Sequence, residues 1–292
     1  MPELPEVEVI RSGLDSLIAK KTIKSIQVFN PKSFQAPISD AETFVNNATI
    51  LKVKRRAKIL MIGLSSGYTL VIHLKMTGQL LFRDNSNESK NFAGGHPSDS
   101  MIGILPDSHT RIEFTFMDGT KLFFNDMRKF GWIKLIPTTR LNDDKFIAKL
   151  GPEPLVGNPM PEYLTRMSRH PRTVIKAALL NQEVVAGIGN IYADEALWGA
   201  MVHPETRVGA LSQEKLEEIL KSAINVMSLS INKGGSTDRN YVNAKGEKGS
   251  YLEFANVFRR EGKPCHRCGA TIEKTRVAGR GTHICPNCQQ LV

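Results

Sequence analysis

Four cysteines near the end of the chain constrain its fold more than any other feature. They form the pair Cys265 and Cys268, then 16 residues, then the pair Cys285 and Cys288. Each C-x-x-C turn aims two thiolates at one point, and two such turns supply the tetrahedral set of four sulfurs that Zn²⁺ prefers. We expect one structural zinc ion per chain, because four cysteine ligands leave no coordination position open for catalysis.

Two histidines, His266 and His283, lie close enough in the sequence to replace a cysteine as ligand, but four cysteines at ribbon spacing favour the all-sulfur site. No other cysteine occurs, which excludes a disulfide framework spread through the fold. The N-terminus is acidic and broken by prolines, unlike a secretory signal, and no apolar stretch approaches the ~18 residues of a membrane span. We therefore expect a cytoplasmic protein without a membrane-spanning segment.

Hydrophobic periodicity divides the 292 residues into a β-rich part and a helical part. Pro5–Ile18 has apolar residues at helical spacing, and the chain from Thr22 to Pro137 has runs that are typical of strands. Helical spacing returns after Gly151–Leu155, a segment rich in proline. The expected strands are Ile23–Val28, Ile59–Leu64, Tyr68–Leu74, Arg111–Phe116 and Lys121–Phe124, and the expected later helices are Val174–Leu180, Ile191–Trp198 and Ser212–Ile231.

These patterns predict an α+β protein in four parts. An N-terminal helix and a β-rich domain occupy residues 1–137, and a linker follows over 138–160. A helical domain spans 161–250, and the zinc ribbon closes the chain over 251–292. The polar segment Asp84–Ser100 is expected to be a surface loop without chemistry.

The charge of the chain points to a polyanionic partner. The formal net charge is +10, and it is concentrated in two segments. Residues 51–83 carry seven Lys and Arg and no acid, and residues 234–292 carry ten against five acids. One basic segment in each domain suggests a groove between the domains that follows the phosphates of a nucleic acid.

Two glycine-containing turns are candidate phosphate sites. The segment Lys274–Gly281 has the pattern of a β-hairpin tip from which Arg280 projects, although a solvated basic turn is the alternative. The turn at Gly187–Gly189 precedes a helix whose free N–H groups and Asn190 could bind phosphate. A plain connection between two helices explains that turn equally well.

The N-terminus contains a candidate nucleophile. Met1 before the small residue Pro2 is normally removed, which leaves a secondary amine, and α-amines titrate near 8 rather than near 10.4 as lysine does. Attack of this amine on a sugar C1′ gives a cationic iminium that favours elimination of the 3′ phosphate. Glu3 is placed to act as general acid or base. The alternative is that Pro2 and Glu3 only begin a helix.

Seven motifs follow one another in order over essentially the whole chain. They are Pro2–Glu8, Arg55–Lys58, Ile72–Met76, Asp126–Gly131, Gly151–Pro154, Gly187–Ala193 and the zinc ribbon. Together they resemble the formamidopyrimidine-DNA glycosylase family. The related endonuclease VIII usually begins Pro-Glu-Gly-Pro-Glu, so Leu4 favours the branch that acts on purines.

The resemblance implies a role for each matching residue. Pro2 is the Schiff-base nucleophile, Glu3 the general acid/base, and Lys58 a phosphate-binding residue that assists catalysis. The implied fold makes residues 1–137 an N-terminal helix and β-sandwich catalytic domain. It makes residues 161–250 a helical DNA-binding domain with a helix-two-turn-helix arrangement and a mobile lesion loop over Ser236–Tyr251. Residues implied to enter the duplex are Met76, Arg128 and Phe130, and those implied to clamp phosphates around the flipped nucleotide are His73, Asn190 and Arg280.

Each duplex-entering residue has a structural alternative, since Met76 and Phe130 could be core and Arg128 surface. Lys75 stands where the family often has Gly or Arg, Arg259 where Gly is common, and the loop 84–108 is longer than usual.

The implied enzyme is a bifunctional glycosylase and abasic-site lyase that excises oxidised purines by β,δ-elimination. Its partner is double-stranded DNA with 8-oxoguanine, formamidopyrimidines or abasic sites, and we expect a monomer in the bacterial cytoplasm, associated with the nucleoid. An oxidised-pyrimidine glycosylase of the endonuclease VIII type and a non-catalytic zinc-ribbon DNA-binding protein are the alternatives.

Overall fold

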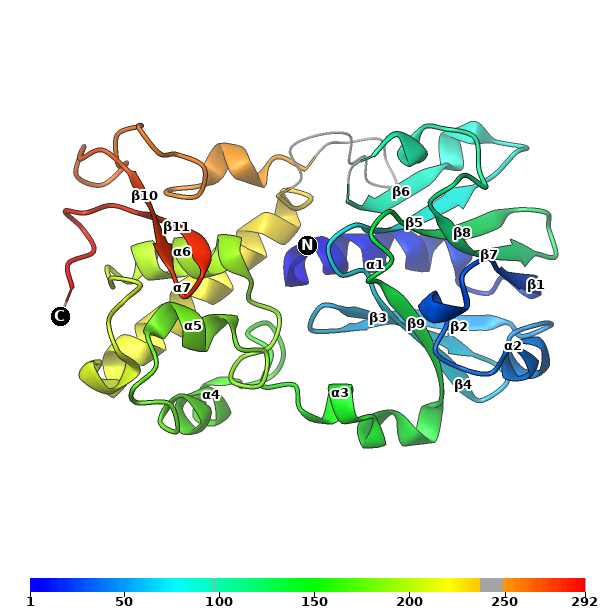
Figure 1. Ribbon diagram of the computed structural model, residues 1–292, viewed down its shortest axis with the longest axis horizontal. Helices are drawn as coiled ribbons and strands as arrows, with labels where there is room; N and C mark the ends of the chain where they lie inside the picture. Colours follow the sequence, from blue (N-terminus) through cyan, green and yellow to red (C-terminus); the bar gives the residue numbers. More distant parts are fainter. Residues whose placement is uncertain (97, 237–248, 292) are drawn as a thin grey trace. The chain divides into compact units, whose positions relative to one another are not determined.

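Two antiparallel sheets and the N-terminal helix make up the first part of the chain (Figure 1). The structure is a computed structural model, and it describes residues 1–96, 98–236 and 249–291. The chain divides into two compact units, Met1–Ile147 with Gly234–Gly249 and Ala148–Lys233 with Ser250–Val292. The four-part division expected from the sequence stays a prediction, because compact units need not coincide with functional domains.

Unit 1 is a β-sandwich with the helix α1 (Leu4–Ile18) packed against β2, β3 and β6. Apolar side chains of α1 and of both sheets form one core, with Ile10, Leu60 and Phe114 all buried. A short helix α2 spans Ile38–Phe44. The five-stranded sheet has the order β1 (Ile23–Val28), β7 (Thr110–Phe116), β8 (Lys121–Asp126), β5 (Gly78–Arg83), β6 (Phe92–Gly95). The four-stranded sheet has the order β2 (Ile50–Arg56), β3 (Ile59–Leu64), β4 (Tyr68–His73), β9 (Trp132–Pro137).

The prediction of a surface loop over Asp84–Ser100 is wrong for Phe92–Gly95. These residues form β6, which pairs with β5, and the ring of Phe92 is buried. The guanidinium of Arg83 holds the segment by donating to the carbonyl of Met101 at 2.6 Å. The run Phe-Ala-Gly-Gly is too short to show strand periodicity, so only pairing with a neighbouring strand identifies it.

Unit 2 contains the later helices and a two-stranded hairpin. The helix α7 begins after Ser212, whose hydroxyl accepts the N–H of Lys215 at 3.2 Å, and its apolar side packs against α6. The helix α6 also packs against β11. The elements are α3 (Lys145–Ala148, across the unit boundary), α4 (Met160–Met167), α5 (Ile175–Leu180), α6 (Asn190–Gly199), α7 (Gln213–Asn232), β10 (Glu273–Val277) and β11 (Arg280–Ile284). Within the described residues, no helix has the length and apolar character needed to cross a membrane.

The turn between β4 and β5 is tightly constrained by its backbone. Lys75 has a left-handed conformation with φ of 51°, and the N–H of Gly78 donates to the carbonyl of Leu74 at 2.9 Å. A side chain at position 78 would place its Cβ 2.8 Å from the Cα of Leu74. Only glycine therefore fits at the end of this turn.

We expect Gly78→Ala to lower the free energy of unfolding by about 1 to 3 kcal/mol, because the new methyl group must displace backbone atoms. Urea denaturation measures this loss. Gly63→Ala is the matched control in the same unit, since its nearest atom, the carbonyl oxygen of Lys52, lies 3.8 Å away. Equal stability of both variants would contradict the constraint.

Candidate active site and metal centre

The start of α1 buries two carboxylates beside the N-terminus. Glu3 caps the helix and forms a reciprocal pair with Glu6, in which each side chain accepts the backbone N–H of the other residue. The N–H of Glu3 donates to Oε2 of Glu6 at 2.9 Å. These bonds satisfy N–H groups that a helix start leaves unpaired, and the helix dipole favours negative charge there.

Glu6 also fixes the start of a distant segment of the chain. Its Oε1 accepts the N–H of Ser236 at 3.0 Å and the hydroxyl of Ser236 at 2.8 Å. This is where the expected lesion loop, Ser236–Tyr251, begins. Residues 237–248 of that loop lie outside the described residues.

Lys58 lies in the turn between β2 and β3, and its side chain is buried. Arg55 braces this turn by donating to the carbonyl of Ala57 at 3.1 Å. The same guanidinium pairs with Glu8 on α1, with 2.9 Å between Nε and Oε2. The turn that carries Lys58 is thus tied to the second turn of the helix that carries the N-terminus.

The α-amino group, Glu3 and Lys58 interact electrostatically. Burial lowers the pKa of the α-amino group of Met1, the negative charges of Glu3 and Glu6 raise it, and the positive charge of Lys58 lowers it. The net effect is a lowered pKa. The structure therefore brings together the three residues expected to form the active centre, Pro2, Glu3 and Lys58.

His73 is buried at the end of β4 in an aromatic setting. Its ring centroid lies 5.6 Å from that of Trp132 and 5.7 Å from that of Phe146. Nδ1 accepts the backbone N–H of Lys75 at 3.0 Å, so the ring proton is on Nε2. Burial, followed by the charges of Lys75 and Lys58, lowers the pKa of His73 to about 3, which makes the ring neutral at pH 7.

The three residues expected to enter the duplex are exposed, which contradicts a core role for Met76 and Phe130. Met76 is 41% exposed and Phe130 56% exposed. The guanidinium carbon of Arg128 lies 4.9 Å from the centre of the Phe130 ring, so these two side chains stack on each other. Large apolar side chains left in water at adjoining turns are typical of a binding surface.

Asp126, which sequence analysis did not single out, joins the two turns that present these side chains. Its buried carboxylate accepts the N–H of Arg128 at 3.2 Å and the N–H of Gly131 at 2.6 Å. The hydroxyl of Thr77, next to Met76, donates to the same carboxylate. An aspartate at the end of a strand and before a turn that contains glycine is the available sequence signal, since Asp commonly accepts N–H groups of the following turn.

In unit 2, Asn190 contacts the hairpin formed by β10 and β11, which also carries Arg280. Nδ2 of Asn190 donates to the carbonyl of Gly281 at 2.9 Å, and the neighbouring Arg280 is exposed. Gly279 turns the hairpin with φ of 74°. The expected hairpin tip is confirmed. The Gly187–Gly189 turn before Asn190 is held by side-chain bonds of Gln182, a residue that sequence analysis missed.

A fully buried ion pair lies beneath the same hairpin. Nζ of Lys176 on α5 is 2.6 Å from Oδ1 of Asp194 on α6, and both side chains are 0% exposed. Lys176 also donates to Thr282 Oγ1 at 2.7 Å and to the carbonyl of Gly281 at 3.1 Å. The other carboxylate oxygen of Asp194 accepts the N–H of His283 at 2.9 Å. The pair therefore joins two helices to β11.

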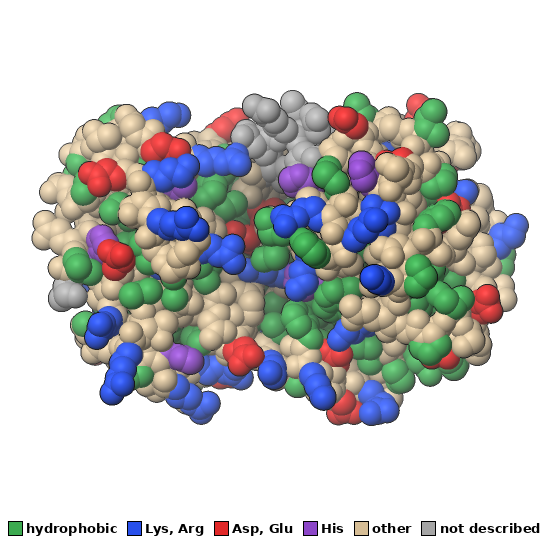
Figure 2. All heavy atoms as spheres, in the orientation of Figure 1, with side chains coloured by type: hydrophobic (Ala, Val, Ile, Leu, Met, Phe, Trp, Pro, Cys, Tyr) green, Lys and Arg blue, Asp and Glu red, His purple; other side chains and the backbone are tan. Residues whose placement is uncertain are grey.

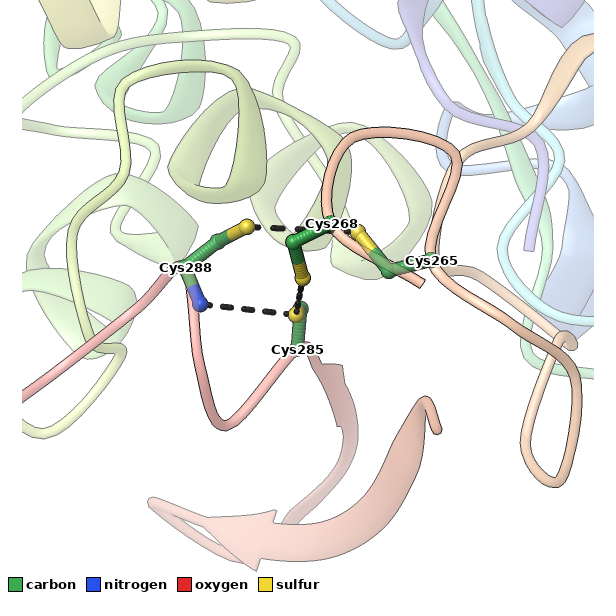
Figure 3. A group of neighbouring side chains, drawn as sticks. All are labelled: Cys265, Cys268, Cys285 and Cys288. Carbon is green, nitrogen blue, oxygen red and sulfur yellow. Dashed lines mark hydrogen bonds between the residues drawn. The ribbon is translucent and has the colours of Figure 1, made fainter. Parts of the chain in front are cut away.

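The four cysteine sulfurs converge on one point, as Figure 3 shows, and all lie within 4.8 Å of one another. This spacing suits a tetrahedral ion with bonds of about 2.3 Å to each sulfur. Burial opposes the thiolate of Cys265, but N–H groups of Arg267, Cys268 and Trp198 lower its pKa to about 6. Burial raises the pKa of Cys285 and of Cys288, so these two thiols lose their protons to the charge of a bound ion. The geometry and chemistry of the sulfurs fit zinc.

The two histidines near the cysteines have other partners. Nδ1 of His266 lies 3.5 Å from Oδ1 of Asn256, and His283 contacts Asp194 and Glu261. Among the residues for which coordinates are described, the candidate metal cluster consists of the cysteines alone. The expectation of four sulfur ligands therefore agrees with the geometry.

Chelation of zinc or Cys268→Ala should unfold the C-terminal hairpin and weaken DNA binding while unit 1 stays folded, because metal binding contributes folding energy to such a site. Metal analysis and hydrogen exchange measure the two effects. His266→Ala is the control and should retain zinc. Zinc-free protein with undiminished DNA binding would contradict the structural role.

Asp194→Asn should lower the free energy of unfolding by about 3 to 5 kcal/mol, because it leaves the Lys176 ammonium buried without its counter-charge. Denaturation monitored within unit 2 measures the loss. Glu162→Gln removes a partner from the more exposed pair with Arg166, 2.7 Å apart, and should cost less than about 1 kcal/mol. Similar losses in the two variants would show that burial of the first pair has no special importance.

Three family profiles match successive parts of this chain. They are the formamidopyrimidine-DNA glycosylase N-terminal domain over residues 1–133, the formamidopyrimidine-DNA glycosylase H2TH domain over 150–241, and the zinc finger found in FPG and IleRS over 262–291. With the sandwich, the helical unit and the cysteine cluster, they confirm the expected fold class and the expected structural zinc.

Similar proteins match almost the whole chain. It is 40% identical to the formamidopyrimidine-DNA glycosylase of Enterococcus faecalis, with 100% of this chain and 98% of that protein covered. The Lactococcus lactis protein bound to Fapy-dG DNA has a TM-score of 0.84 at 32% identity and covers 99% of this chain and 100% of its own. Its complex with DNA containing an oxidised pyrimidine has a TM-score of 0.84 at 31% identity, with the same coverage. The chain belongs to the formamidopyrimidine-DNA glycosylase family.

Proposed function

We propose that this protein is a bifunctional DNA glycosylase and abasic-site lyase that excises oxidised purines, among them 8-oxoguanine and formamidopyrimidines, from double-stranded DNA. Family membership supports the reaction class. The observation that carries the proposal is the burial of Glu3 and Lys58, both of which interact electrostatically with the start of the chain at Met1. Removal of Met1 would leave the secondary amine of Pro2, a nucleophile, beside the same two groups.

The reaction begins after removal of Met1 exposes the secondary amine of Pro2. The nitrogen lone pair forms a bond to C1′ of the damaged nucleotide while the bond from C1′ to the base breaks, and Glu3 transfers the proton that assists departure of the base. The added amine then returns its proton to Glu3, and the nitrogen lone pair forms the iminium as the bond between C1′ and O4′ breaks and O4′ takes that proton. The iminium draws electrons from C2′, which loses a proton while the bond from C3′ to the 3′ phosphate breaks. A second elimination expels the 5′ phosphate, and Lys58 offsets phosphate charge during these steps.

The exposed side chains of unit 1 supply the duplex contacts in this proposal. Met76 and Phe130 fill the space that the flipped nucleotide leaves, and Arg128 meets the unpaired cytosine. Asp126 fixes the two turns relative to each other, which limits the freedom lost on binding. Three rigidly held side chains can then enter the base stack together.

His73, Asn190 and Arg280 are the proposed phosphate contacts. His73 offers the Nε2 proton, and Arg280 offers a guanidinium from the hairpin that Asn190 and Lys176 hold at Gly281. Figure 2 shows exposed Lys and Arg side chains on each unit taken by itself. This distribution supports a DNA partner, because phosphate contacts provide most of the sequence-independent affinity.

An oxidised-pyrimidine substrate is the second candidate. The complex of the similar Lactococcus lactis protein with DNA containing an oxidised pyrimidine favours it. Excision from duplexes that each carry one defined lesion distinguishes the two substrate classes. For location, we propose the bacterial cytoplasm, where reduced thiols persist and where nucleoid DNA is present.

Borohydride should trap one covalent adduct between each active chain and abasic DNA, because it reduces the iminium on Pro2. Peptide mapping should locate the link at the N-terminus. Protein that retains Met1 should bind the DNA and fail to form the adduct. Glu3→Gln should bind as well as the wild type and lose base excision.

The rival nucleophile is Lys58, whose amine ordinarily titrates near 10.4. Lys58→Met therefore serves as the matched variant, since it should weaken the reaction and still form the adduct at Pro2. An adduct mapped to Lys58, or efficient trapping by protein with Met1 in place, would falsify the N-terminal mechanism.

A further inference from the structure

Lys75 keeps a long side chain at a backbone position that favours glycine. Its φ of 51° is left-handed, where the Cβ of an L residue crowds the next carbonyl. The backbone contact made here, from the N–H of Lys75 to Nδ1 of His73 at 3.0 Å, would be available to glycine as well. The turn therefore does not require the side chain of Lys75.

The ammonium of Lys75 also has no acidic partner. Throughout residues 1–96, 98–236 and 249–291, Nζ of Lys75 makes no hydrogen bond or ion pair, and its contact is with the Phe146 ring, 5.9 Å from the centroid. The side chain is nevertheless half-buried. Partial burial of an unneutralised charge is unfavourable unless an anion binds beside it.

Two arginines of the same basic segment have structural partners. Arg55 pairs with Glu8, and Arg83 donates to the carbonyls of Phe92 and Met101. Their charges are therefore used within the fold. In the described part of the chain, Lys52 and Lys54 make no ion pair either, but both are exposed to water, whereas Lys75 is half-buried and has no counter-charge.

The neighbours of Lys75 identify the class of anion. His73, two residues earlier, presents an Nε2 proton, and Met76, the next residue, projects into solvent. These three groups match a nucleic acid strand, which offers phosphates beside stacked bases. The hydrogen-bond donor and the ammonium suit a phosphate, and the exposed apolar side chain suits the bases. His73 is neutral at pH 7, so its Nε2–H can donate a hydrogen bond to a phosphate but cannot offset the charge of that phosphate.

We propose that Lys75 is a phosphate-binding residue of this chain, whose ammonium pairs with a phosphodiester of the DNA strand next to the position of Met76. The inference rests on the proposed function, because it assigns one more contact to the same DNA. It also explains why a side chain is kept in a left-handed turn. In this arrangement the ammonium of Lys75 offsets phosphate charge, and the N–H of His73 supplies a directional hydrogen bond to phosphate.

The test compares binding of wild type, Lys75→Gly, Lys75→Met and Lys75→Arg to a duplex with a stable abasic-site analogue, from about 50 to about 200 mM NaCl. One phosphate contact contributes about 0.9 to the slope of log K against log salt. The binding constant of the wild type should therefore exceed those of the Gly and Met variants most at low salt. The ratio of the binding constants should fall about threefold over the salt range. Lys75→Arg should keep the full slope.

Lys20→Gly is the matched control. Lys20 is an exposed lysine of unit 1 with φ of 70°, so the same substitution is made in the same backbone conformation. Its binding slope should equal that of the wild type. Lys75→Gly should melt within about 2 °C of the wild type or above it, because glycine relieves the left-handed strain while it weakens DNA binding.

Three results overturn the inference. If Lys75→Gly and Lys75→Met keep the wild-type slope while the wild type binds the duplex, the ammonium contacts no DNA phosphate. If phosphate raises the Tm of the wild type but not of Lys75→Gly at equal ionic strength, and the DNA slope is unchanged, the ligand is free phosphate. If the wild type neither binds the duplex nor forms the borohydride adduct, the proposed function fails and this inference fails with it.

Discussion

The first turn of α1 stabilises a helix and also sets the electrostatics of the candidate active centre. Glu3 and Glu6 accept N–H groups that every helix start leaves unpaired, and the same two carboxylates face the α-amine. Glu8, on the following turn, pairs with Arg55 and so fixes the turn that carries Lys58. A shift in where α1 begins would therefore move every group of the centre at once.

Sequence analysis could predict the features that depend on local pattern. The cysteine spacing indicated the metal cluster, and apolar periodicity indicated α1, α7 and β3 close to their observed bounds. The strand β2 was not expected, because Lys52, Lys54, Arg55 and Arg56 hide its alternation, and it exists by pairing with β3. The short strand β6 likewise depends on β5. Strand pairing is a long-range property, so a local window does not contain it.

The buried charges were also beyond prediction from sequence. Lys176 stands in Ile-Lys-Ala-Ala-Leu-Leu, where a lysine is normally placed in solvent, and only the fold reveals Asp194 and Thr282 around it. The same holds for Asp126, whose partners come from two separate turns. The family resemblance supplied part of what the pattern lacked. It identified Met76 and Phe130 as residues that contact DNA, whereas the hydrophobic pattern alone could not distinguish them from core residues.

Two independent constraints hold the hairpin that presents Arg280. The cysteine cluster fixes its base, since Cys285 directly follows β11, and the bonds of Lys176 and Asn190 to the carbonyl of Gly281 fix it near the tip. A strand pair of this length is marginal in water by itself. Because it is held at both its base and its tip, this short hairpin can keep one conformation without further strands.

Gly234–Ser236 and Gly249 belong to unit 1, which makes that unit discontinuous in the sequence. No single cut of the chain can separate the two units intact, because a fragment ending at Ile147 lacks Ser236 and its hydrogen bonds to Glu6. The N-terminal sandwich therefore cannot be transferred by simple truncation or gene fusion with its helix start complete. Recombination between relatives keeps this contact only when the product retains a carboxylate in place of Glu6 together with the segment that brings Ser236 to it.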